Sequence, residues 1–225
     1  MSTPQHIAQN IQTIEDQLPT GCKLIVVSKY RGVEEIQAAY ACGQRLFAEN
    51  RVQALLERKE ALPADIEWHL IGHLQTNKVK YITPFISMIH AVDSIKLLQE
   101  INKEAAKSNR VIPCLVQLHI AQEETKFGLD AGELDAFFVA YQNGNMTHVT
   151  LSGLMAMASN TDDRSQIAAE FAQVQSLFTT VKDKYFPDQA EFCELSIGMS
   201  SDYDIAIAHG STLVRVGSAV FAKTA

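Results

Sequence analysis

The chain has 225 residues, of which 47% are hydrophobic and 20% are charged, and its net charge is -7. That length supports one large α/β domain with a sizeable buried core. The acidic balance gives no long-range attraction to nucleic acid or to an anionic membrane, and no apolar run approaches the roughly 18 residues of a membrane-spanning helix. With no signal-peptide pattern and four scattered cysteines, we expect a cytoplasmic protein with reduced thiols.

Short apolar segments typical of strands alternate with amphipathic segments typical of helices. After a leading helix at 4–17, we expect eight strands, at 23–29, 45–50, 67–72, 88–92, 112–120, 148–156, 191–198 and 212–217. The longer intervening helices are expected at 33–43, 50–62, 93–108, 130–144 and 162–186. Such alternation produces right-handed parallel units, and eight of them close into a (β/α)8 TIM barrel. We therefore predict an α/β fold with a single domain over residues 1–225.

An open, doubly wound sheet is the rival architecture. It would require a glycine-rich turn of the GxGxxG type after the first strand. The first strand is instead followed by "SKYRG", residues 28–32, which lacks that pattern. The barrel is therefore the preferred prediction.

The lysine that ends the first apolar segment, Lys29, is the first candidate for chemistry, because the active face of a barrel is the carboxyl end of its strands. An ordinary lysine there would extend into solvent. A lysine partly desolvated in the barrel mouth could instead use its amine as a nucleophile toward a carbonyl. Such an amine would serve either an aldehyde cofactor or a sugar-phosphate aldolase, and the composition does not separate the two.

The last two strands are each followed by a turn that predicts an anion site. "SIGMSSD" places Gly198 and Met199 before a helix expected to open at Ser200, and "RVGS" places Gly217 before a short helix expected to open at Ser218. Unpaired N–H groups at helix starts favour anions, and barrels commonly bind phosphate after their last two strands. We expect a phosphate to bind there.

Two further groups can be placed by spacing alone. Leu213, Arg215 and Gly217 share one face of the last strand, which predicts that Arg215 points into the barrel. His69 and His73 lie on a strand and its following turn with no carboxylate to complete a ligand set, so no metal site is expected.

Several segments together resemble one known family over about residues 23–221. They are "VVSKY", "FAENRVQ", "WHLIGHLQTNKVK", "SGLMAM" and "SIGMSSDYDIAIAHGSTLVRVGSAVF". Their combination is similar to the pyridoxal phosphate homeostasis protein family, whose members look like the barrel domain of alanine racemase standing alone. Tyr30 and Ala48 depart from the family pattern, where threonine and glycine are usual.

The resemblance implies that pyridoxal 5'-phosphate binds as a Schiff base on Lys29. It places Asn50 near the phenolic oxygen of the ring and Arg215 against the pyridine nitrogen. We also expect His69 to pack or hydrogen-bond beneath the cofactor. The phosphate would be held by Ser200, with the backbone around Gly198 and Met199, and by Gly217 and Ser218. Lys126, at the rim, matches a lysine common in the family.

The same resemblance implies a carrier in vitamin B6 homeostasis and no catalytic residues. A cation at the pyridine nitrogen disfavours its protonation and weakens the ring as an electron sink. We expect no second domain of the kind that supplies a tyrosine base in alanine racemase. Transfer to apo-enzymes, binding of other B6 vitamers and a monomeric state are expected. A low-activity racemase and, less favoured, a Schiff-base aldolase remain the alternatives.

Overall fold

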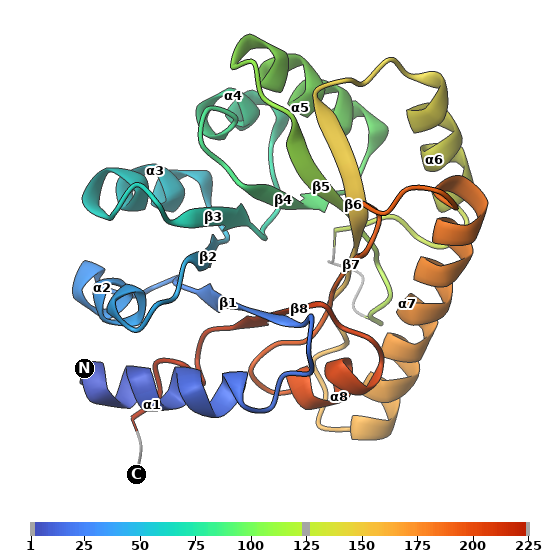
Figure 1. The fold of residues 1–225 in the computed structure, drawn as a ribbon. Helices are drawn as coiled ribbons and strands as arrows, with labels where there is room; N and C mark the ends of the chain where they lie inside the picture. Colours follow the sequence, from blue (N-terminus) through green and yellow to red (C-terminus); the bar gives the residue numbers. More distant parts are fainter. Residues whose placement is uncertain (1–2, 123–126, 224–225) are drawn as a thin grey trace.

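The computed structural model describes residues 3–122 and 127–223. Its eight parallel strands form a closed barrel in the order in which they occur along the chain (Figure 1). The barrel closes where β1 pairs with β8, with Ile25 opposite Arg215. The predicted (β/α)8 barrel is therefore confirmed. The strands are β1 (Lys23–Val27), β2 (Leu46–Glu49), β3 (Glu67–Leu70), β4 (Met88–Val92), β5 (Ile112–Gln117), β6 (Val149–Met155), β7 (Glu194–Ser196) and β8 (Leu213–Val216).

The helices surround the barrel and include the predicted leading helix, which runs beside α2 (Figure 1). They are α1 (Pro4–Glu15), α2 (Val33–Ala41), α3 (Val52–Ala61), α4 (Val79–Ile82), α5 (Ile95–Lys107), α6 (Leu134–Asn143), α7 (Arg164–Tyr185) and α8 (Tyr203–Ala208). The short α4 and the 3-10 turn η1 (Thr76–Lys78) before it were not predicted, because one turn is too short to show helical periodicity.

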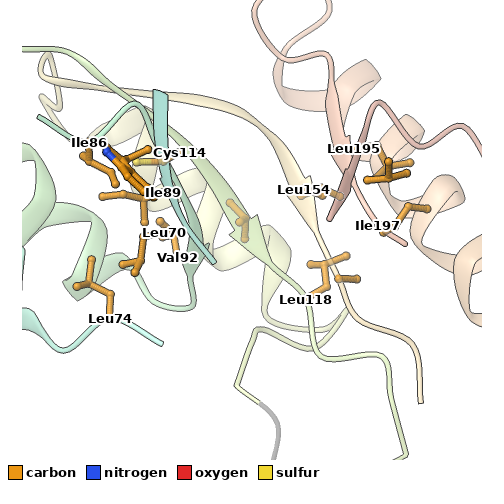
Figure 2. Packing of buried hydrophobic residues seen from close by; sticks show 14 of the residues in the cluster. Leu70, Leu74, Ile86, Ile89, Val92, Cys114, Leu118, Leu154, Leu195 and Ile197 are labelled. Carbon is orange, nitrogen blue, oxygen red and sulfur yellow. The ribbon is translucent and has the colours of Figure 1, made fainter. Parts of the chain in front are cut away.

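The hydrophobic core has two parts because side chains on a strand alternate between its faces. Leu24 and Val26 on β1 pack outward against the helices, whereas Ile25 and Val27 pack inside the barrel. The larger outer part contains the contacts drawn in Figure 2, which include Leu70, Leu154, Leu195 and Ile197. Burial on both faces explains why apolar residues occur on both faces of β1 and do not strictly alternate with polar ones.

Two local predictions at the end of the chain need correction. No helix opens at Ser218: residues 218–221 form a single turn, closed by the Phe221 N–H bonding the Gly217 carbonyl. The carbonyls of Val220 and Ala222 accept hydrogen bonds from Asn10 on α1, which binds this segment to α1.

The helix after β7 also begins later than expected. Residues 199–202 form a turn in which the Asp202 carboxylate accepts from the Met199 N–H, and α8 starts at Tyr203. Over residues 3–122 and 127–223, no helix is both long and apolar enough to span a membrane.

Candidate cofactor site

A cavity of about 560 Å³ opens at the carboxyl end of the barrel. Seven of the nine expected site residues line it, namely Lys29, Asn50, Met199, Ser200, Arg215, Gly217 and Ser218. They follow or belong to β1, β2, β7 and β8, so closure of the barrel brings distant parts of the sequence together. His69 and Gly198 are not part of the lining.

Lys29 lies in a tight turn where the chain leaves β1. The Arg31 N–H bonds the Ser28 carbonyl at 3.0 Å, which closes the turn, and Tyr30 within it has a positive φ of 66°. Ser28 is buried, whereas Lys29 and Tyr30 are exposed. Of the two environments considered for Lys29, the structure shows the exposed one, at the mouth of the cavity.

A buried carboxylate supports this turn from beneath. Glu49, 1% exposed at the end of β2, accepts a hydrogen bond of 2.7 Å from the Ser28 hydroxyl. Arg58 on α3 lies 3.9 Å from the same carboxylate and donates to the Arg31 carbonyl. Burial raises the pKa of Glu49, and the Ser28 hydrogen bond opposes this shift. Glu49 thus holds the lysine turn at Ser28, and Arg58 holds it at Arg31.

The turns after β7 and β8 meet at the same cavity, next to the lysine turn. The Ser200 hydroxyl accepts hydrogen bonds from the N–H groups of Gly217 at 3.2 Å and of Ala219 at 3.4 Å. A side chain at Gly217 could not be accommodated freely, because its Cβ would lie 3.0 Å from the Val27 carbonyl oxygen. Glycine thus permits the close approach of β8 to β1 next to Lys29.

Arg215 is buried and points into the barrel, as the spacing predicted. Its guanidinium donates to the Ser196 hydroxyl at 2.6 Å, to the Ser196 carbonyl at 2.6 Å and to the Ala156 carbonyl at 2.9 Å. Burial lowers the pKa of Arg215 to about 10, and nearby Asp202 opposes the shift. Arg215 therefore remains a cation at neutral pH.

A chain of buried polar groups continues from Arg215 across the barrel interior. The Ser196 hydroxyl lies 3.0 Å from Nδ1 of His90, and Nε2 of His90 lies 2.9 Å from Nδ1 of His69. Burial lowers the pKa of His69 to about 4 and holds that of His90 well below its usual range, so both imidazoles are neutral.

Only the first bond of this chain has a fixed direction: Ser196 accepts from Arg215, because a guanidinium can only donate. The Ser196 hydroxyl also bonds His90, which in turn bonds His69. His69 is the far end of this chain; it does not line the cavity and is linked to it through His90, Ser196 and Arg215. Neither His90 nor Ser196 was identified from the sequence.

The remaining candidates lie outside this cavity. His73 bonds Asp93 at 3.1 Å and stacks on Phe127 at 3.9 Å between ring centroids. Within the part of the chain that the structure describes, no three His, Cys, Asp or Glu residues gather in a way that could hold a metal. Lys126 lies outside the described residues.

The alanine racemase N-terminal domain model matches residues 3–224 of this sequence. The chain belongs to this family. It is also 36% identical to the pyridoxal phosphate homeostasis protein of Pasteurella multocida, over 96% of this chain and 93% of that protein. The corresponding protein of Aquifex aeolicus is 36% identical over 89% of this chain and 86% of its own length. The resemblance inferred from the motifs is thus confirmed.

Solved structures of this family show the same barrel. PipY of Synechococcus elongatus, 34% identical, superposes with a TM-score of 0.90 in its form without PLP and 0.87 with PLP bound, covering 96% of this chain and 100% of PipY. Alanine racemase of Bartonella henselae, 18% identical, gives a TM-score of 0.71 and is covered over 59% of its length. The likeness to that racemase concerns the fold alone.

Proposed function

We propose that this protein binds pyridoxal 5'-phosphate and acts in vitamin B6 homeostasis, with Lys29 as the covalent anchor. One observation carries the proposal: an exposed amine, a turn rich in N–H and hydroxyl groups, and a buried guanidinium line one cavity of about 560 Å³. Its volume lies within the range of small-molecule sites. The relative PipY, similar over nearly the whole chain, has been solved with PLP bound.

The residues present suit the three chemical parts of such a cofactor. When bound, pyridoxal 5'-phosphate supplies an aldehyde with which an amine forms a Schiff base, with loss of water. Lys29 would provide this amine. Ser200, Gly217 and Ser218 would provide hydroxyl and N–H donors to the phosphate, supported by the backbone at Gly198 and Met199. Asn50 would accompany Lys29 at the aldehyde side.

Arg215 favours a carrier over an enzyme. Its charge, retained at neutral pH, would disfavour protonation of a pyridine nitrogen placed against it, and an unprotonated ring withdraws electrons weakly. Three hydrogen bonds to Ser196 and Ala156 hold the guanidinium in place. The site would therefore retain a reactive aldehyde without promoting carbanion chemistry.

A low-activity amino-acid racemase is the second candidate, and one observation favours it. Tyr30 lines the cavity beside Lys29, where a phenol could exchange a proton with a substrate. Incubating the loaded protein with single L-amino acids in D2O tests this function, because racemisation would incorporate deuterium at the α carbon. A Schiff-base aldolase, the weaker alternative, predicts that the purified protein carries no visible absorbance band.

The location, oligomeric state and partners of the protein belong to the same proposal. We infer a cytoplasmic monomer of one domain, residues 1–225, that can deliver its cofactor to apo-enzymes and also bind other B6 vitamers. Exposure of Lys29 supports delivery, because a displacing amine can reach the anchor from solvent.

Replacing Lys29 tests the covalent anchor. Lys29→Ala should abolish the visible absorbance band of the loaded protein and leave thermal unfolding nearly unchanged, since the side chain is exposed. Borohydride reduction followed by peptide mass mapping should place the pyridoxyl group on Lys29 in the unmodified protein. Lys96→Ala, which removes another exposed lysine on α5, is the matched control and should retain the band. A pyridoxyl group found on another lysine would contradict the assignment.

A further inference from the structure

A second cavity, of about 380 Å³, lies next to the cofactor cavity. Asn50 lines both, so the two are neighbours at the end of β2. The start of α3 forms one side of the second cavity, and the segment after β3 contributes His73, Gln75 and Lys78 to the other. Of the nine expected cofactor residues, only Asn50 lines this cavity, so the proposed cofactor site does not explain it.

Two cations face this cavity from different parts of the fold. Arg51 precedes α3 and Lys78 belongs to η1, and no residue that the structure describes forms an ion pair with either of them. The described lining contains no aspartate or glutamate, in a chain whose net charge is -7. Both cations are exposed and have no described counter-charge, so the cavity has a positive lining that an anion would neutralise.

Backbone donors add to the same surface. α3 has ten residues, and its N-cap, Arg51, is extended and makes no side-chain hydrogen bond to the helix. The N–H groups of Val52 and Gln53, in the first turn, therefore lack an acceptor within the helix. Leu56 and Tyr81 supply an apolar wall, and the ring of Tyr81 lies 5.8 Å from the Lys78 ammonium. The cavity thus combines cations, free N–H groups and an apolar surface.

We propose that this second cavity binds a small molecule through an oxyanion, a carboxylate or a phosphate. Arg51 and Lys78 contact the oxyanion, the first turn of α3 donates to it, and the body of the ligand rests against Leu56 and Tyr81. Because Asn50 borders both cavities, such a ligand lies beside the occupant of the cofactor cavity. The proposal is independent of the cofactor assignment, since neither Lys29 nor Arg215 takes part.

An amide NMR titration of the full chain tests this site, with inorganic phosphate and acetate as separate probes at constant ionic strength. Saturable shifts of the Val52 and Gln53 amides are expected with at least one probe. Charge-assisted hydrogen bonds are strong, so the Arg51→Gln/Lys78→Gln double variant should bind about tenfold more weakly or worse. The relative affinities for phosphate and acetate then identify which oxyanion the site prefers.

Lys80→Gln is the matched control, because Lys80 also lies over Tyr81, at 5.0 Å, but does not line the cavity. It should bind as the unmodified protein does. Equal affinity in the double variant would overturn the proposal. So would equal shifts with sodium chloride alone, or shifts confined to the turns at Ser200 and Gly217. The thermal unfolding of each variant shows whether it is folded. If the double variant does not fold, the single Lys78→Gln variant replaces it.

Discussion

At the scale of single residues, Tyr30 adopts a conformation that its side chain does not favour. Its φ of 66° lies in the left-handed region, which costs roughly 1 kcal/mol or more for residues other than glycine, asparagine and aspartate. The hydrogen bond between Arg31 and Ser28 holds the turn in this shape. Strain is thus stored one residue away from the proposed anchor, as is common at functional sites.

Relieving this strain should stabilise the protein. We expect Tyr30→Asn to raise the free energy of unfolding by roughly 0.5–1 kcal/mol, because asparagine tolerates the left-handed region. Little packing is lost, since the tyrosine is 81% exposed. Urea unfolding measures the change.

The reverse substitution supplies a control at another turn. Asn109 has a φ of 49°, so Asn109→Tyr should lower the free energy of unfolding by a similar amount. A destabilised Tyr30→Asn variant would show that the tyrosine ring makes a favourable contact that outweighs the strain.

At the scale of elements, Glu49 connects β2 to the turn after β1 and to α3. Its carboxylate accepts from Ser28 and faces Arg58, whose guanidinium also donates to the Arg31 carbonyl. The Nε of Arg58 is buried and has no hydrogen-bond partner, so the nearby carboxylate is its main electrostatic compensation. The position of the lysine turn therefore depends on contacts between three elements.

Removing this carboxylate should be costly. Glu49→Ala deletes a buried hydrogen bond to a charged group and leaves Arg58 without its counter-charge, so we expect a loss of roughly 2–3 kcal/mol in the free energy of unfolding. Urea unfolding measures it.

A second acid in the same region provides the comparison. Glu35 pairs with Arg31 at 3.7 Å on a more exposed surface, and Glu35→Ala should cost only about 0.5 kcal/mol. Equal effects of the two substitutions would contradict a supporting role for Glu49.

At the scale of the whole molecule, the buried histidines make stability depend on pH. His69 and His90 are neutral in the folded protein, and burial lowers the pKa of each. The unfolded chain binds protons at these positions below about pH 6.5, whereas the folded protein does not, so stability falls as the pH falls toward 4. His69 alone should account for roughly 2 kcal/mol between pH 7 and pH 5. Glu49 acts in the opposite sense. Because burial raises its pKa, its contribution to the free energy of unfolding falls as the pH rises through that pKa.

Urea unfolding at pH 7 and pH 5 tests this dependence. His69→Gln should reduce it. NMR of the folded protein gives a second readout, in which the ring signals of His69 and His90 should not titrate over this range. Titration of either ring near pH 6 would contradict the assignment.

Short-range patterns in the sequence were enough to predict the fold and the direction of the Arg215 side chain. Period-two alternation on one strand was enough to place Arg215 inside the barrel, and the alternation of apolar and amphipathic segments was enough to predict the fold. The partners of Arg215 were not predictable, because Ser196 lies 19 positions away and is linked in turn to His90, 106 positions from it. Those contacts depend on the register of strands across the barrel, which local sequence does not encode.

The wrong prediction of a helix at Ser218 also arose from contacts between distant parts of the chain. A helix was expected at Ser218 from its local sequence, yet the carbonyls that follow are bonded by Asn10, 210 and 212 positions earlier.

The pairing of β1 with β8 has a consequence for synthesis of the protein. Lys29 and the turn at Gly217 become neighbours only when the first and last strands pair, with Val26 beside Val216. A nascent chain that has left the ribosome only as far as β7 contains the proposed anchor but lacks the part of the cavity that β8 and the turn after it supply. Loading of a cofactor at the proposed anchor would thus require β8 to have paired with β1, so the loaded fraction would measure how much of the protein has closed its barrel.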